Sequence, residues 1–167
     1  VLFCAAGGIW FHMDGRIQGR AFAVLVALAL TSLVVMNFRK PILDVKYAKG
    51  QNLPQELFAK WNSFSRIGLV EKTKWIVIDA DASTGIAWYD FEHLKPEDRE
   101  GLLTGGPALP YLLKPGGRSL IIGPGGGYDV ARALASGSKS ITGVEINPII
   151  ANTIMRERFP ELSNRLY

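Results

Sequence analysis

The feature that most constrains this chain is a glycine-rich stretch, GPGGG at residues 123–127, between two short apolar runs. The preceding run, RSLII at residues 118–122, predicts a buried parallel strand, because such strands are short and nearly continuously apolar. Glycine permits a positive φ and a close approach to a ligand, and a helix starting near Tyr128 would point free N–H groups at it. The stretch predicts a strand-to-helix turn that holds a ligand, with a tight turn lacking a ligand as the alternative.

A second strand and an acidic residue extend this pattern. Residues 140–144 form the next apolar run, and Glu145 follows it, 22 residues beyond Gly123. A carboxylate at that spacing, at the tip of the second strand, is placed to accept hydrogen bonds from ribose hydroxyls. We therefore expect an α/β fold over residues 116–167, namely the first half of a Rossmann-like domain that binds a nucleoside cofactor.

The glycine positions narrow the choice of cofactor. The dinucleotide fingerprint G-x-G-x-x-G would need glycine at position 128, where the chain has Tyr128, and the Gly-Lys-Ser/Thr of a nucleotide-triphosphate loop is absent from the sequence. The spacing G-x-G-x-G is associated with adenosylmethionine-binding folds, so we expect S-adenosylmethionine or decarboxylated S-adenosylmethionine. The residues expected to bind it are Gly123, Pro124, Gly125, Gly126, Gly127, Tyr128, Asp129, Glu145 and Ile146.

Residues 21–38 (AFAVLVALALTSLVVMNF) carry no charge. As a helix rising ~1.5 Å per residue they would span roughly 27 Å, close to the thickness of about 30 Å of a bilayer's hydrocarbon core. Arg20 and Arg39 flank the run and can reach the headgroups. The run predicts a transmembrane helix. A buried core helix and a signal peptide remain as alternatives, although the apolar run continues past the small residues Ala27 and Ala29, where a signal peptide would be cleaved.

The charges around this run predict its orientation. Residues 1–13 are also uncharged and resemble the end of a preceding membrane helix, so residues 1–40 are expected to form a single transmembrane helix or a hairpin. Two Lys or Arg residues precede the run at residues 14–20, and four follow it at residues 39–49. Because positive charge stays on the cytoplasmic side, we expect a membrane protein, single-pass or multi-pass, whose C-terminal domain is cytoplasmic.

The middle of the chain has weaker signals. Residues 41–62 are expected to be a linker, in which residues 55–62 are compatible with a short helix. Residues 63–115 are expected to form a small antiparallel β element with short helices. Its expected strands are residues 66–70, 74–78 and 86–89, with a turn at 79–85, and its expected helices are residues 96–103 and 108–113.

Other candidate sites are few. Asp79 and Asp81 would share one face of a strand and in principle bind a cation or a substrate amine, but acids that accept hydrogen bonds from backbone amides in a turn are more common. Cys4, His12 and His93 have no ligand spacing, so no metal site is expected. The net charge of +4 comes from scattered basic residues and from those that follow the apolar run, so membrane lipid is a more suitable partner than nucleic acid.

The chain contains the segments LIIGPGGG at 120–127 and GVEINP at 143–148 and, as looser matches, WNSFSR at 61–66 and IDADAST at 78–84. Together these four segments resemble the spermidine synthase-like proteins, including membrane-spanning relatives with a domain of the adenosylmethionine-dependent methyltransferase type. The resemblance covers roughly residues 61–167. Ile121 stands where many methyltransferases carry an acid, and a β element before the cofactor domain is expected of polyamine synthases, where it shapes the substrate entrance.

The resemblance implies aminopropyl or methyl transfer to an amine or another small acceptor. The sequence is compatible with an oligomer and does not indicate the number of subunits. Gly126 stands where polyamine synthases usually have aspartate, and Ser83 stands where they have a cofactor-binding glutamine. Their catalytic aspartate is expected beyond Tyr167, so no catalytic residue is assigned. The alternative is a non-catalytic membrane protein whose α/β domain senses a nucleoside or mediates assembly, whereas Tyr128 argues against a nicotinamide-dependent enzyme.

Overall fold

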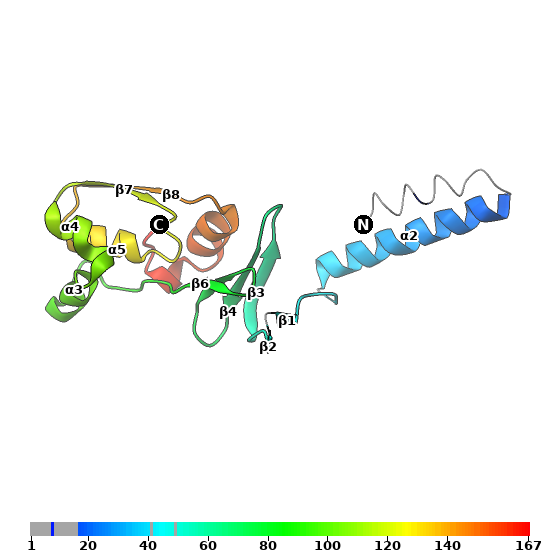
Figure 1. Ribbon diagram of the computed structural model, residues 1–167, viewed down its shortest axis with the longest axis horizontal. Helices are drawn as coiled ribbons and strands as arrows, with labels where there is room; N and C mark the ends of the chain where they lie inside the picture. Colours follow the sequence, from blue (N-terminus) through cyan, green and yellow to red (C-terminus); the bar gives the residue numbers. More distant parts are fainter. Residues whose placement is uncertain (1–7, 9–16, 41, 49) are drawn as a thin grey trace. The chain divides into compact units, whose positions relative to one another are not determined.

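The computed structural model describes residues 8, 17–40, 42–48 and 50–167, and it divides the chain into two compact units. The first unit ends at Lys46 and the second spans residues 47–167. The first contains an apolar helix. The second contains a four-stranded antiparallel sheet followed by a small parallel β/α segment, so the fold is mixed α/β (Figure 1).

Helix α2 (Ile17–Arg39) contains the apolar run predicted to be helical. Within it, Ala21–Arg39 is long and apolar enough to cross a membrane, and a signal sequence would meet the same criteria. Residues 33–36 are four consecutive large apolar residues, all exposed. Because four consecutive positions go once around a helix, α2 exposes apolar side chains on every side over this stretch. The helix expected at residues 1–13 lies almost entirely outside the described residues and stays a prediction.

The antiparallel sheet has the order β3-β4-β5-β6 and follows a short hairpin of β1 (Tyr47–Ala48) and β2 (Gln51–Asn52). Its strands are β3 (Glu56–Trp61), β4 (Arg66–Val70), β5 (Ile76–Ile78) and β6 (Ala82–Thr84). The short helix considered for residues 55–62 is therefore wrong. The sequence of β3, ELFAKW, contains good helix formers, but pairing with β4 decides its conformation.

A buried ion pair joins the first two strands of this sheet. The Arg66 guanidinium donates to both carboxylate oxygens of Glu56, at 2.8 and 2.7 Å, and the two side chains are 3% and 12% exposed. Glu56 lies directly over Gly68, where an added Cβ would overlap Glu56 Oε1. Residues 56–61, expected in a linker, are thus an integral part of the sheet.

The β5–β6 turn is tighter than expected. Asp79 and Ala80 have positive φ values of 51° and 61°, and Asp81 N donates to Ile78 O at 3.2 Å, so β6 lies within the segment predicted as a turn. The strand expected at residues 86–89 is not formed. Asp79 Oδ1 accepts a hydrogen bond from Arg66 N at 2.8 Å, so this acid satisfies a backbone donor of the neighbouring strand β4 and not one in its own turn.

The remainder of the second unit contains the predicted strand–helix–strand pattern. Strands β7 (Arg118–Ile122) and β8 (Ser140–Val144) pair in parallel, Ile122 opposite Val144, and α5 (Tyr128–Ala135) lies on one side of them (Figure 1). The predictions for these three elements are confirmed. The other helices are α3 (Pro96–Leu102), η1 (Gly106–Ala108), α4 (Leu109–Leu113), the π-helix η2 (Ile149–Arg158) and η3 (Pro160–Ser163).

Two clusters of buried apolar residues hold the second unit together. The first packs the antiparallel sheet against η2, and the second packs α3 and residue 87 against α5. The antiparallel sheet therefore supports the helix that follows β8. The first cluster contains Phe58, Ile67, Leu69, Ile76, Ile149, Ile150, Ile154 and Met155, and the second contains Ala87, Leu102, Ala131 and Ala135.

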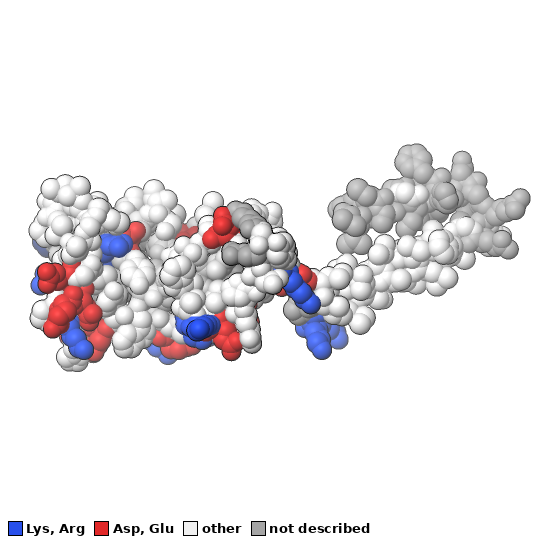
Figure 2. All heavy atoms as spheres, turned by 60° about the horizontal axis from the view of Figure 1, so that its bottom comes forward, with Lys and Arg blue, Asp and Glu red and all other residues white. Residues whose placement is uncertain are grey.

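Charged side chains are distributed differently over the two units. On the face in Figure 2, basic and acidic side chains are interspersed over the second unit. The described part of α2 is uncharged over most of its length in the same view. This distribution matches the composition of the two parts of the chain, because the charges concentrate after residue 38.

Candidate functional site

The glycine loop, residues 123–127, connects β7 to α5. Three of its glycines, Gly123, Gly125 and Gly127, have positive φ values of 70°, 54° and 92°. Residues other than glycine rarely adopt that region. Gly127 N donates to Pro124 O at 2.8 Å, which closes the turn immediately before α5 begins. The backbone conformation therefore requires glycine at all three glycine positions of the predicted G-x-G-x-G spacing.

Gly126 is required for a steric reason instead. A Cβ at this position would overlap the carbonyl oxygen of Gly85 and approach Ile86 Cα to 3.1 Å. Gly126 O accepts a hydrogen bond from Ala87 N at 2.8 Å, and Gly126 N donates to Thr84 Oγ1 at 3.3 Å. Residues 84–87 thus run against the loop, and this contact gives a physical reason why aspartate does not stand at position 126.

The carboxylate of Glu145 contacts the glycine loop. Glu145 follows the last residue of β8, and its Oε2 accepts a hydrogen bond from Gly125 N at 3.1 Å. Its Oε1 accepts one from Asn147 N at 2.9 Å. Because each carboxylate oxygen has two lone pairs, both oxygens retain capacity for a hydroxyl donor.

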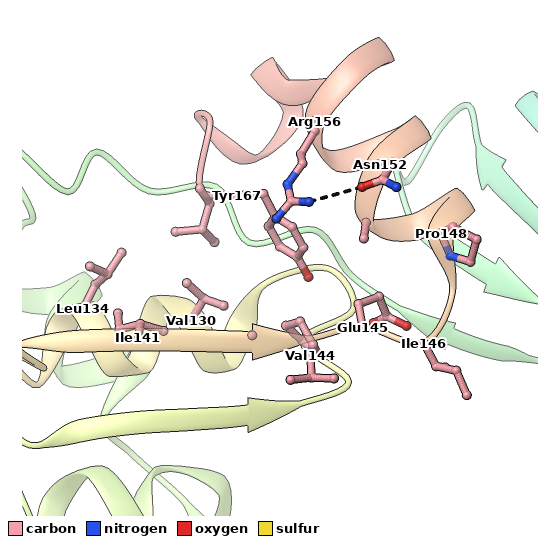
Figure 3. Close-up of a pocket in the computed structure, with 14 residues that line it drawn as sticks. Val130, Leu134, Ile141, Val144, Glu145, Ile146, Pro148, Asn152, Arg156 and Tyr167 are labelled. Atoms are coloured by element: carbon pink, nitrogen blue, oxygen red, sulfur yellow. Dashed lines mark hydrogen bonds between the residues drawn. The ribbon is translucent and has the colours of Figure 1, made fainter.

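A pocket of about 560 Å³ lies between α5, β8 and η2, beside Glu145 (Figure 3). This volume is within the range of pockets that bind small molecules. Of the nine residues expected to bind a cofactor, Pro124, Glu145 and Ile146 line it. The remaining lining residues are Val130, Leu134, Ile141, Gly143, Val144, Pro148, Ala151, Asn152, Arg156, Leu166 and Tyr167.

The four loop glycines do not line this pocket, and neither do Tyr128 and Asp129, which were also expected at the site. The Arg132 guanidinium lies over the Tyr128 ring, 5.9 Å from its centroid, and donates to Asp129 Oδ1 at 2.9 Å. The Tyr128 ring also lies close to Gly85, on the segment that contacts the glycine loop. These two side chains therefore help to hold the start of α5.

Three polar residues of the pocket were missed by the sequence analysis: Asn152, Arg156 and Tyr167. Arg156 Nη1 donates to Asn152 Oδ1 at 3.2 Å, and Figure 3 shows this pair on η2 above β8. Tyr167 Oη donates to Gly125 O at 2.7 Å. Burial raises the pKa of the Tyr167 hydroxyl far above its usual value, and the Glu145 carboxylate raises it further. No local motif marks these residues.

Comparison with known proteins does not identify a relative of this chain. No protein-family model matches it, no curated protein matches it, and no solved structure matches it. The resemblance to spermidine synthase-like proteins therefore stays a prediction. Among the residues that the structure describes, no group of three or more His, Cys, Asp or Glu side chains is arranged to hold a metal ion.

The steric role of Gly126 is testable with alanine. Gly126→Ala should lower the free energy of unfolding by about 1–3 kcal/mol, because the added methyl group overlaps the backbone of residue 85. Gly106→Ala is the matched control, since an added Cβ there meets nothing within 4 Å. Denaturant unfolding of both variants measures the difference. Equal stabilities of the two variants would show that residues 84–87 do not restrict this position.

Proposed function

We propose that the second unit binds an adenosyl cofactor, and that the protein is a membrane-anchored transferase of the spermidine synthase-like type. The cofactor would be S-adenosylmethionine or its decarboxylated form. The observation that carries the proposal is the position of Glu145. Its carboxylate lies at the end of a parallel strand, hydrogen-bonded to a glycine loop that leads into a helix, and it lines a pocket of suitable size.

Each part of the proposed site has a distinct role. Ligands of open parallel sheets bind at the carboxyl ends of the strands, where the glycine loop and Glu145 both lie. The start of α5 would hold the amino-acid or propylamine end, because the N–H groups of the four loop glycines already donate to acceptors within the protein. Glu145 would accept hydrogen bonds from the ribose hydroxyls. Ile146, 81% exposed, offers an apolar surface to the base.

The proposed reaction is a displacement at carbon. When bound, the cofactor would supply an electrophilic carbon next to a sulfonium. A small acceptor, such as an amine, would form a bond to that carbon as the carbon–sulfur bond breaks, the thioether would leave, and the amine would release a proton to solvent. The contribution of the described residues is to bind and orient, which places the two reactants in line. We assign no catalytic base to any described residue.

The membrane anchor in this proposal is α2. Over residues 33–36 it exposes apolar side chains on every side, which is unfavourable in water and favourable in lipid. Four Lys and Arg residues within residues 39–49 follow the apolar run, so the second unit would be cytoplasmic, where adenosyl cofactors are synthesised. Lipid would surround α2, and the small acceptor would reach the second unit from the cytosol.

The orientation is testable with reporters fused after Tyr167. A fluorescent protein that folds only in the cytosol should be bright, and alkaline phosphatase, which needs export, should be inactive, because positive charges follow the apolar run. Replacement of Arg39 and Lys40 by glutamate in both fusions tests whether these positive charges set the orientation. It should reduce the preference for a cytoplasmic second unit. Active exported phosphatase, or an N-terminus that begins after Ala29, would contradict a cytoplasmic domain with an uncleaved anchor.

Cofactor binding is testable by calorimetry on the full chain in detergent. The chain should release or absorb heat with S-adenosylmethionine or its decarboxylated form. Glu145→Ala should weaken binding by roughly 1–3 kcal/mol, because the ribose hydroxyls lose their acceptor. Glu157→Ala is the matched control, since Glu157 is exposed on η2 and does not line the pocket. Absence of binding to the unmodified chain would refute the proposal, and unchanged affinity in Glu145→Ala would remove Glu145 from the site.

A further inference from the structure

Three side chains form a closed hydrogen-bonded ring between the antiparallel sheet and the residues after β8. Asn62 Nδ2 donates to Asn147 Oδ1 at 3.0 Å, Asn147 Nδ2 donates to Ser65 Oγ at 2.8 Å, and Ser65 Oγ donates to Asn62 Oδ1 at 3.2 Å. Asn147 and Ser65 are 4% and 5% exposed. Hydrogen bonds away from water strengthen one another in such a ring, so the three side chains have one favoured arrangement.

The sheet side of the ring is fixed by its own backbone. Residues 62–65 form the turn between β3 and β4, and Asn62 N donates to Ser65 O at 3.0 Å. Asn62 Oδ1 also accepts from Phe64 N at 3.0 Å and from Ser65 N at 2.8 Å. The turn therefore fixes the positions of the Asn62 amide and the Ser65 hydroxyl, both of which hydrogen-bond to Asn147.

Asn147 connects the turn to Glu145 by hydrogen bonds. Its Oδ1 accepts a further hydrogen bond from Ile149 N, at 3.1 Å, which secures the chain between β8 and η2. Its backbone N–H, held by these contacts, donates to Glu145 Oε1, while Gly125 N donates to Glu145 Oε2. The Glu145 carboxylate is thus fixed between two amides, and the ring sets the position of one of them.

We infer that Asn62, Ser65 and Asn147 are positioning residues that hold the Glu145 carboxylate against the glycine loop. A turn of the antiparallel sheet therefore controls the geometry of the acid at the end of β8. The consequence for adenosyl affinity rests on the proposed function. A ring that only packed the two parts of the unit together would act on stability and leave the contact between Glu145 and Gly125 unchanged.

The Gly125 amide reports this contact without any ligand. Asn62→Asp keeps the size of the side chain and an acceptor oxygen for the turn, but it replaces the donor to Asn147 by a carboxylate oxygen. In the full chain in detergent, hydrogen exchange at Gly125 should become about tenfold faster, as expected for loss of one hydrogen bond. Asn52→Asp, the same change at an exposed residue of β2, should leave it unchanged.

Ser65→Ala is a second variant that removes the hydroxyl from the ring and keeps the backbone bonds of the turn. It should also accelerate exchange at Gly125, with little change at the amides that pair β4 with β5. Unchanged exchange at Gly125 in both variants would overturn the inference. Faster exchange throughout the sheet, with no excess at Gly125, would overturn it as well, because the ring would then be only structural.

A double-mutant cycle with S-adenosylmethionine tests the consequence for binding. Asn62→Asp alone should weaken binding of S-adenosylmethionine about tenfold. When Asn62→Asp is added to the Glu145→Ala variant, binding should not become weaker than in Glu145→Ala alone. Equal weakening in both backgrounds would show that Asn62 does not act through Glu145. Absence of binding to the unmodified chain would refute the proposed function alone, since exchange at Gly125 decides the positioning role independently.

Discussion

The carbonyl oxygen of Gly85 lies where the Cβ of any other residue at position 126 would stand. The rest of the candidate site depends on this close contact between the two backbone segments. The contact lets residues 84–87 pack backbone to backbone against the glycine loop, with a hydrogen bond from Ala87 N to Gly126 O. A second restraint on the loop comes from Glu145, which accepts from Gly125 N. The loop is therefore preformed, and a ligand would not have to order it on binding.

The antiparallel sheet acts as a scaffold for these contacts. Its buried face packs against η2. One hydrophobic cluster therefore contains residues from both sides of position 116, where the sequence predicts the boundary between the β element and the Rossmann-like domain. The hydrogen-bonded ring at Asn147 lies near the same junction. A substitution in the sheet can for this reason alter the site that follows β8, even when the substituted residue does not line the pocket.

The sequence predicts the elements whose signals are local. The apolar runs that become β7 and β8 bracket glycines whose spacing matches a required backbone conformation, so strand, loop and helix could all be located. Strand β3 could not be located from the sequence, because its composition suits a helix and only its pairing with β4 makes it a strand. The contact of Asn62 with Asn147 spans 85 residues and leaves no pattern in the sequence. Asn152 and Arg156 enter the pocket from a π-helix, whose register no sequence period indicates.

The central claim is that Glu145 and the glycine loop bind an adenosyl group. A map of amide chemical-shift changes on addition of S-adenosylmethionine to the isotope-labelled chain tests it most directly. We predict the largest changes at the amides of Gly123 and Gly125–Gly127 and at those of residues 145–147. The changes at residues 145–147 should be smaller for a ligand that lacks the ribose hydroxyls. Changes confined to other parts of the chain, or no changes at saturating ligand, would contradict the claim.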